Sequence, residues 1–300
     1  MFGVTILGNN SALPAYNRHP TSQVITLSDH LFLVDCGEGT QMQMNHYKIR
    51  RSRINHIFIS HLHGDHYFGL PGLLTSFGLM GRPQDLHLYG PAALQQIIDF
   101  ILNVGATVLP YKLHFHALEE KSMLVDDEHF SVESFPVFHR IDCWGFVFRE
   151  KRKPRKINPE ATTQYNVPIE CFERLKQGED FIQDSRTIPN EILTIPNKPS
   201  KSYAFAADTL YKESLADIVR HVDLLYHEAT YLEDKLDKAV SRFHSTSGQA
   251  AMLAKRAAVK KLLIGHFSST YESLDNFLVE AKKIFPATEL ALEGQTFMIV

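Results

Sequence analysis

The chain has 300 residues, of which 44% are hydrophobic and 22% are charged, and its formal net charge at pH 7 is −3. These values exclude collagen-like, disordered and coiled-coil proteins, and no apolar run approaches the roughly 20 residues that a membrane-spanning helix requires. The first ten residues lack a basic leader and the three cysteines lie far apart, so we expect a cytoplasmic protein without disulfides.

Short apolar, β-branched segments alternate with helix-like segments, which is typical of an α/β fold. We expect strands at residues 2–7, 23–27, 31–35, 56–60, 86–89, 112–116, 129–135, 144–149, 202–207, 223–226, 261–264 and 296–300. We expect helices at residues 39–48, 70–79, 92–102, 212–219, 248–258 and 274–284. Two serine and threonine pairs precede the last two helices and can cap them, namely Ser245 with Thr246 and Ser268 with Ser269.

The stretch from about residue 150 to residue 200 is polar, rich in proline and nearly without periodicity. A long irregular segment is uncommon inside a compact domain unless it protrudes or has a function, so we expect an excursion with one short helix at 169–176. Residues 149–156 hold six basic residues and one acidic residue. The net charge of this segment is +5, so the remainder of the chain must carry −8 to give the total of −3. A basic segment on an acidic body suits a polyanionic partner, although a run of charges is more often only a solvated loop.

Metal-ligand residues are concentrated directly after the expected strand at 56–60. The sequence there reads His61-Leu62-His63-Gly64-Asp65-His66, with three imidazoles and a carboxylate in six positions. Zinc-like divalent ions bind these side chains, and Gly64 permits the tight turn that brings them together. A polar surface cluster rarely has this pattern after a buried strand, so the motif predicts a metal site.

Three other apolar runs end in a lone ligand-type residue, namely His139, Asp208 and His266. Residues just past the carboxyl ends of strands converge on one crevice of an open α/β sheet. We therefore expect one ion to be held by His61, His63 and His139, a second by Asp65, His66 and His266, and Asp208 to bridge them. Two ions about 3.5 to 4 Å apart can activate a shared water and clamp the oxygens of a displacement at phosphorus.

The order of these motifs resembles the metallo-β-lactamase superfamily over nearly the whole chain. That resemblance implies a four-layer αβ/βα sandwich with a dinuclear site at one edge. Three further stretches, Asp-Cys-Gly-Glu-Gly-Thr-Gln at 35–41, His-Glu-Ala-Thr at 227–230 and His-Ser-Thr at 244–246, narrow it to the ribonuclease Z family. The resemblance implies one metallo-β-lactamase-like domain over residues 1–300, with residues 150–200 inserted as a protruding tRNA-binding arm.

The resemblance further implies a zinc-dependent endoribonuclease with two zinc ions per chain and precursor tRNA as its partner. Such an enzyme removes the 3′ trailer and leaves a 3′-hydroxyl on the tRNA, through attack of a metal-bridged hydroxide on the phosphodiester. The resemblance also implies a homodimer in which the arm serves the partner's active site. We expect no membrane association, and a cytoplasmic location.

Two segments depart from the family pattern. The loop that reads PxKxRN in the family reads Pro-Ala-Tyr-Asn-Arg-His at 14–19, so its lysine and final asparagine are missing. The arm lacks the usual Gly-Pro tip between residues 167 and 178. These departures concern the grip on the substrate rather than the chemistry.

Three side chains are predicted to act in catalysis. Asp65 would orient the attacking water or take its proton, and His244, ahead of a helix, would protonate the ribose 3′ oxygen, which is a poor leaving group. Glu228 would orient His244, and His227 would have a supporting role. Asp35 could accept a hydrogen bond from a ligand imidazole.

The predicted RNA contacts are basic and come from the N-terminal loop and the start of the arm: Arg18, Arg149, Lys151, Arg152, Lys153, Arg155 and Lys156. Nine further histidines have no predicted function. Two of them, His114 and His116, would share one face of a strand, without a carboxylate partner.

Two alternative functions are compatible with the metal motif. One is a phosphodiesterase, sulfatase or thioester hydrolase that acts on small molecules, which would not need the segment at 150–200. The other is a metal-binding RNA adaptor without catalysis, which would have no need for the acid and base at Asp65, Glu228 and His244.

Overall fold

The computed structural model describes residues 1–151, 153–184 and 186–300. The chain divides into two compact units. The first comprises residues 1–126, 131–149 and 201–300, and the second comprises residues 127–130 and 150–200. No helix in the described part of the chain has both the length and the apolar character needed to cross a bilayer.

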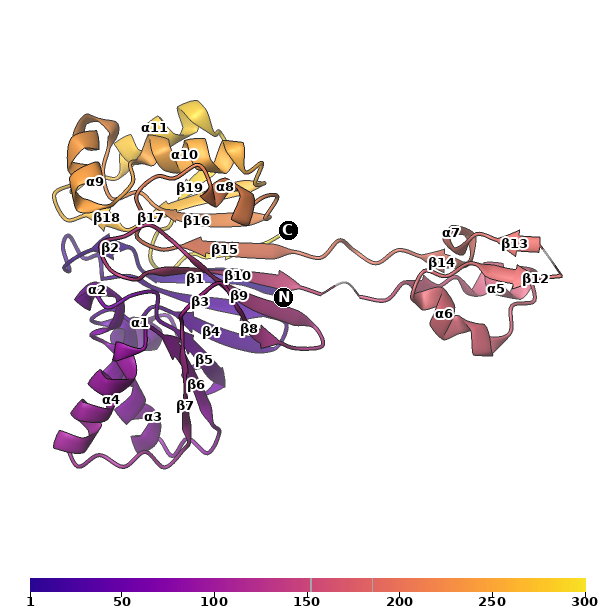
Figure 1. Ribbon diagram of the computed structural model, residues 1–300, viewed down its shortest axis with the longest axis horizontal. Helices are drawn as coiled ribbons and strands as arrows, with labels where there is room; N and C mark the ends of the chain where they lie inside the picture. Colours follow the sequence, from indigo (N-terminus) through magenta and orange to yellow (C-terminus); the bar gives the residue numbers. More distant parts are fainter. Residues whose placement is uncertain (152, 185) are drawn as a thin grey trace. The chain divides into compact units, whose positions relative to one another are not determined.

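The first sheet of the large unit has seven strands. Their order is β20 (Thr296–Met298), β1 (Phe2–Gly8), β3 (Ser22–Leu27), β4 (His30–Val34), β5 (Ile54–Phe58), β6 (Leu86–Gly90) and β7 (Leu113–Ala117). Strands β4 to β7 run parallel. Three helices, α1 (Thr40–His46), α3 (Leu70–Leu79) and α4 (Ala93–Val104), lie on one face of this sheet (Figure 1). Their buried apolar side chains belong to the same core cluster as those of the strands.

The second sheet also has seven strands. Their order is β19 (Thr288–Leu290), β17 (Lys261–Gly265), β16 (Leu224–Glu228), β15 (Ser202–Ala206), β10 (Trp144–Glu150), β9 (Phe130–Pro136) and β8 (Met123–Asp126). Helices α10 (Ser247–Arg256) and α11 (Asp275–Ile284) lie on its outer side (Figure 1). The inner faces meet through phenylalanine pairs, with Phe58 and Phe146 ring centroids 5.3 Å apart. The layers are therefore helix, sheet, sheet and helix, which confirms the predicted αβ/βα sandwich.

All twelve predicted strands are present, with boundaries shifted by at most a few residues. Strands β8 and β19 and helices α2 (Gly64–Tyr67) and α9 (Leu236–Arg242) were not predicted, and α8 (Leu215–Ile218) is shorter than expected. Thr246 caps α10, as predicted, and it does so through a reciprocal capping box with Gln249, which was not predicted. The predicted capping of α11 by Ser268 and Ser269 is wrong, because the Asp275 amide donates instead to Ser273 Oγ at 3.2 Å.

The second unit has more regular structure than the expected single short helix. It contains β11 (Lys156–Ile157), α5 (Pro159–Gln164), η2 (Ile169–Cys171), α6 (Phe172–Lys176), β12 (Phe181–Gln183), β13 (Arg186–Ile188), α7 (Asn190–Leu193) and β14 (Thr194–Ile195). Leu175, Phe181 and Leu193 contribute to a small buried core of its own. The buried Asn190 side chain donates to the carbonyls of Leu175 and Glu179 at 2.8 and 2.7 Å. Side-chain hydrogen bonds to backbone carbonyls therefore help to order a segment whose sequence shows no periodicity.

A row of stacked imidazoles crosses β5, β6 and β7. The His87 ring centroid lies 5.0 Å from that of His56 and 4.8 Å from that of His114, and His87 Nδ1 lies 2.9 Å from His116 Nε2. The expectation that His114 lacks a carboxylate partner is wrong, because His114 Nε2 lies 2.8 Å from Asp85 Oδ2. Asp85 precedes the neighbouring strand, and only the strand register brings the two residues together.

Replacing His56 by phenylalanine is expected to make the protein less sensitive to acid. Burial, followed by repulsion from His87 and other histidines, lowers the pKa of His56 to about 4. The unfolded chain binds this proton near pH 6.5, so the stability from a neutral His56 is lost as the pH falls from about 6.5 toward 4. The free energy of unfolding is measured with urea at pH 7 and at pH 5, in the presence of a metal chelator. Its decrease from pH 7 to pH 5 should be about 2 kcal/mol smaller in His56→Phe than in the wild type. Equal losses would contradict this account.

Candidate active site

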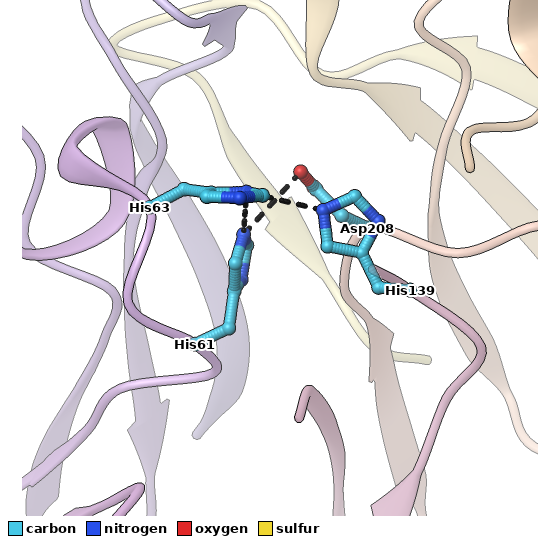
Figure 2. A group of neighbouring side chains, drawn as sticks. All are labelled: His61, His63, His139 and Asp208. Carbon is cyan, nitrogen blue, oxygen red and sulfur yellow. Dashed lines mark hydrogen bonds and ion pairs between the residues drawn. The ribbon is translucent and has the colours of Figure 1, made fainter. Parts of the chain in front are cut away.

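Three imidazoles and a carboxylate converge at one edge of the large unit (Figure 2). His63 Nδ1 lies 3.0 Å from His61 Nε2 and 3.1 Å from His139 Nε2. Asp208 Oδ2 lies 3.6 Å from His61 Nε2. His61 and His63 follow β5, His139 follows β9 and Asp208 follows β15, so both sheets contribute to this first group.

The first group fits a cation better than a hydrogen-bonded cluster. Its ring nitrogens face a common point, and His63 Nδ1 alone is close to two other ring nitrogens. Each ring nitrogen of a neutral imidazole either donates one hydrogen bond or accepts one. His63 Nδ1 therefore cannot form hydrogen bonds with both of its neighbours. Burial, followed by neighbouring charges, lowers the pKa of His61 well below its ordinary value and that of His63 to about 4. Both are therefore neutral at pH 7, the form that binds metals.

A second group consists of Asp65, His66 and His266. His266 Nε2 lies 3.3 Å from His66 Nε2 and 3.4 Å from Asp65 Oδ2. Asp208 faces this group as well, with Oδ1 3.2 Å from His266 Nε2 and Oδ2 3.5 Å from His66 Nε2. The structure thus brings together all seven predicted ligands, with Asp208 between the two groups.

The Nδ1 atoms of His66 and His61, which point away from the centre, have polar partners. Asp35 Oδ2 lies 2.7 Å from His66 Nδ1, as the sequence suggested, and Asp35 Oδ1 accepts the Ser60 amide at 2.8 Å. Ser60 Oγ lies 3.0 Å from His61 Nδ1. Such partners fix the ring orientation and the tautomer of a ligand imidazole. Ser60 was not predicted, and nothing in its sequence position other than its adjacency to His61 pointed to it.

Thr230 links the second group to a further acidic residue. Its hydroxyl donates to Glu228 Oε2 at 2.7 Å and can therefore accept from His266 Nδ1 at 2.9 Å. His266 has a φ of 59°, in the left-handed region that few non-glycine residues occupy. Backbone strain of this kind concentrates at functional sites, and here it turns the ring from the end of β17 toward Asp65.

The fully buried Glu228 and the partly buried His244 form an ion pair. His244 Nδ1 lies 2.9 Å from Glu228 Oε1, which also accepts the Thr209 amide at 2.9 Å. Burial alone would lower the pKa of His244, but the attraction of Glu228, with smaller contributions from Asp208 and Asp65, raises it to about 9. His244 is therefore cationic at pH 7. It precedes the capped N-terminus of α10, as predicted, and its role as an acid stays a prediction.

His63, Asp65, Asp208 and His244 line one cavity of about 460 Å³. Arg140, Arg242 and the exposed Phe68 line it too, and none of these three residues was predicted as part of the site. Arg140 and Arg242 lie one and two positions from His139 and His244, which was the only signal that could have found them. The cavity is therefore acidic at its centre and carries basic side chains in its wall.

The predicted RNA contacts fall into two sets. Arg18 Nε donates to Asn10 Oδ1 at 3.0 Å and its Nη1 to the Glu272 carbonyl at 2.8 Å, so its donors fix the N-terminal loop, and a phosphate contact stays a prediction. Arg149 lies on β10, and Arg152 lies outside the described residues. The others are in the second unit, where Lys153 and Lys156 are exposed, Lys151 is half-buried and Arg155 donates to Thr194 at 2.6 Å.

Comparison with known proteins gives one partial and several full-length matches. The family model for the anti-Pycsar protein Apyc1 matches residues 2–141. A ribonuclease Z of Bacteroides thetaiotaomicron is 44% identical over 99% of this chain and 95% of its own length, and one of Parabacteroides distasonis is 44% identical over 99% of both chains. The chain belongs to the ribonuclease Z family. The predicted resemblance is thereby confirmed.

Solved structures agree with this ribonuclease Z assignment. The short form of human tRNase Z is similar, with a TM-score of 0.72, 26% identity and 99% of each chain covered. The metallo-β-lactamase-fold protein YhfI from Bacillus subtilis, with a TM-score of 0.70 and 20% identity over 99% of this chain and 98% of its own, supports the fold alone. The two histidine and aspartate groups of this chain have the residue types and spacing to hold metal ions.

Proposed function

We propose that this chain is an endoribonuclease that removes the 3′ trailer from precursor tRNA and leaves a 3′-hydroxyl on the tRNA. The observation that supports it most directly is the pairing of His244 with Glu228, because His244 lines the same cavity as His63, Asp65 and Asp208 of the two ligand groups. Cleavage of RNA at this position expels a ribose 3′ oxygen, which needs a proton. A cationic imidazole beside the ligand groups meets that need.

We also propose that two zinc ions bind per chain. His61, His63 and His139 would hold the first, Asp65, His66 and His266 the second, and Asp208 would contact both. Histidine nitrogens and carboxylate oxygens are ordinary zinc ligands. The ions would supply Lewis acidity to the scissile phosphodiester and acidify water beside it.

The protein side chains then carry out the proton transfers. Asp65 lines the cavity and would orient the attacking water and accept its proton. His244 would donate its proton to the leaving 3′ oxygen, and Glu228 would keep the imidazole charged and in place. Asp35, Ser60 and Thr230 hold the ligand rings in the tautomers that the ions require.

The defining experiment is cleavage of a precursor tRNA of known sequence, followed by mapping of both new ends. A single cut at the start of the trailer, with a 3′-hydroxyl on the tRNA, is the expected result. Parallel incubation with bis-p-nitrophenyl phosphate tests the small-molecule alternative. Turnover of that ester without any cleavage of the precursor would exclude the nuclease.

We propose that the second unit, residues 150–200, binds the tRNA body as an arm. Its basic start would contact phosphates, since duplex RNA offers little sequence readout to side chains. The double variant Lys153→Ala/Lys156→Ala should raise KM for precursor tRNA several-fold and weaken its salt dependence, while kcat changes little. Lys121→Ala, an exposed lysine of the large unit, is the matched control. Equal loss on the small ester would indicate a role in folding instead.

A homodimer is proposed as the working form of the protein. Large apolar side chains are exposed on α3, α4 and the loop after α4, with Leu79 85%, Phe100 68%, Val104 73% and Val108 89% accessible. Exposed apolar surface of this extent is typical of protein interfaces. Light scattering after gel filtration should give twice the chain mass, and Phe100→Asp with Val104→Asp should halve it. A wild-type monomer would contradict the dimer.

We further propose a cytoplasmic location. Cys36, Cys143 and Cys171 are all unpaired thiols in the structure, in keeping with a reducing compartment.

A further inference from the structure

Two arginines line the cavity of the candidate active site, and the mechanism above does not use them. Arg140 follows His139 directly, and Arg242 is the last residue of α9, two positions before His244. Both side chains are exposed. They lie 102 positions apart in the sequence and yet line the same space.

A hydrogen bond fastens the two arginine-bearing segments to each other. His139 Nδ1 donates to the carbonyl of Phe243 at 2.9 Å, so the residues next to Arg140 and Arg242 are joined. Phe243 has a φ of 59° and ends α9, and the His244 amide donates to the Ala239 carbonyl at 2.9 Å. The arginine backbones are therefore held in place by the same contacts that position His139 and His244.

Neither guanidinium group forms an ion pair with a carboxylate among the residues that the structure describes. Arg220 and Arg256, by contrast, pair with Asp217 and Glu213. Arg140 Nη2 lies 3.4 Å from His63 Nε2. If His63 offers Nδ1 to an ion, its Nε2 carries the proton and cannot accept from an arginine. The donors of Arg140 then remain available to a substrate.

We propose that Arg140 and Arg242 bind the two RNA phosphates that flank the scissile linkage, one arginine to each. This inference rests on the proposed function. Guanidinium groups bind phosphate oxygens in a bidentate manner, and paired cations in one cavity match a polyanion that passes through it. A small phosphodiester lacks these neighbouring phosphates. The two arginines therefore favour an RNA strand over a small ester and set the path of the strand across the ligand groups.

The test combines single arginine variants with single neutral phosphates. Precursor tRNA is prepared with one methylphosphonate linkage, placed either one nucleotide upstream or one nucleotide downstream of the cleavage site. For the wild type, each substitution should raise KM about tenfold, the loss of one charge-assisted contact. Arg140→Ala and Arg242→Ala should each raise KM about tenfold on the unmodified RNA. Each variant should then be insensitive to one of the two methylphosphonates and remain sensitive to the other.

The matched control is Arg50→Ala, an exposed arginine that precedes β5, at the opposite end of that strand from His61. It should behave as the wild type does on all three RNAs. A second measurement does not depend on turnover: binding of a precursor with a non-cleavable methylene in place of the scissile 3′ oxygen. The slope of log Kd against log salt should fall by about 0.7 for each arginine removed.

Two results would overturn the inference. One is that both arginine variants remain as sensitive as the wild type to both methylphosphonates. The other is that their salt slopes for the non-cleavable RNA match that of Arg50→Ala. Failure of the wild type to cut unmodified precursor would instead overturn the proposed function, and the binding measurement would still decide the arginine contacts.

Discussion

Asp65→Asn is expected to lower kcat for precursor tRNA about a thousandfold, within the range that general base catalysis supplies. Burial alone would raise the pKa of Asp65, but His66 and His266 hold it well below its ordinary value, so the carboxylate is ionised throughout the neutral range. Asparagine keeps the size of the side chain and can still accept the Ala12 amide, which donates to Asp65 Oδ2 at 2.7 Å. It cannot take a proton from water.

The Asp65 experiment needs a control for metal loss. Metal analysis of the wild type should give two zinc ions per chain, and the variant should keep at least the ion of the first group, because that group does not include Asp65. Asp99→Asn, at an exposed position on α4, should keep full activity. A variant that retains more than a tenth of the wild-type rate would contradict the role of Asp65, and one ion in the wild type would contradict the paired site.

His244→Asn should reduce cleavage of precursor tRNA about a hundredfold or more and reduce turnover of bis-p-nitrophenyl phosphate less than tenfold. The RNA reaction expels an alkoxide, which gains much from an acid, whereas p-nitrophenolate leaves without a proton. The ratio of the two losses separates an acid from a residue that only supports the fold. Similar losses on both substrates would contradict the assignment.

The same assignment predicts a pH dependence. A general acid must be protonated, and the pKa of His244 is about 9, so kcat for the RNA should hold through neutral pH and fall above about pH 9. Glu228 makes the largest contribution that raises this pKa. Glu228→Gln should therefore move the alkaline fall to lower pH, because the proton is bound less tightly. Turnover of bis-p-nitrophenyl phosphate, which needs no acid, should show no fall that depends on His244. A fall for RNA that does not move in Glu228→Gln would contradict the pairing.

The sequence was sufficient to predict the ligands because of where they occur. His61, His63, Asp65 and His66 lie within one turn, and His139, Asp208 and His266 each follow an apolar strand. Residues close in sequence stay close in the fold, and the ends of neighbouring parallel strands meet at one edge of a sheet. Both patterns can therefore be recognised in the sequence. The two-sheet sandwich was predicted from the family resemblance. The individual strands were predicted from short apolar, β-branched segments.

Other features depend on register and could not be predicted. Asp85 meets His114 only through the pairing of β6 with β7, and Thr230 reaches His266 only because β16 and β17 are parallel neighbours. The core of the second unit is assembled from scattered apolar residues without a period. Arg140 and Arg242 are ordinary exposed arginines until the His139–Phe243 hydrogen bond places them together.

The position of Asp208 between the two ligand groups has a consequence for biosynthesis. Its partners come from both sheets, and His266 is made about 200 residues after the histidine-rich turn. A chain emerging from the ribosome carries the first half of the ligand set long before the second, so it has no complete catalytic centre while it is near cellular RNA. The complete ligand set can therefore come together only after His266 has been made and both sheets have folded.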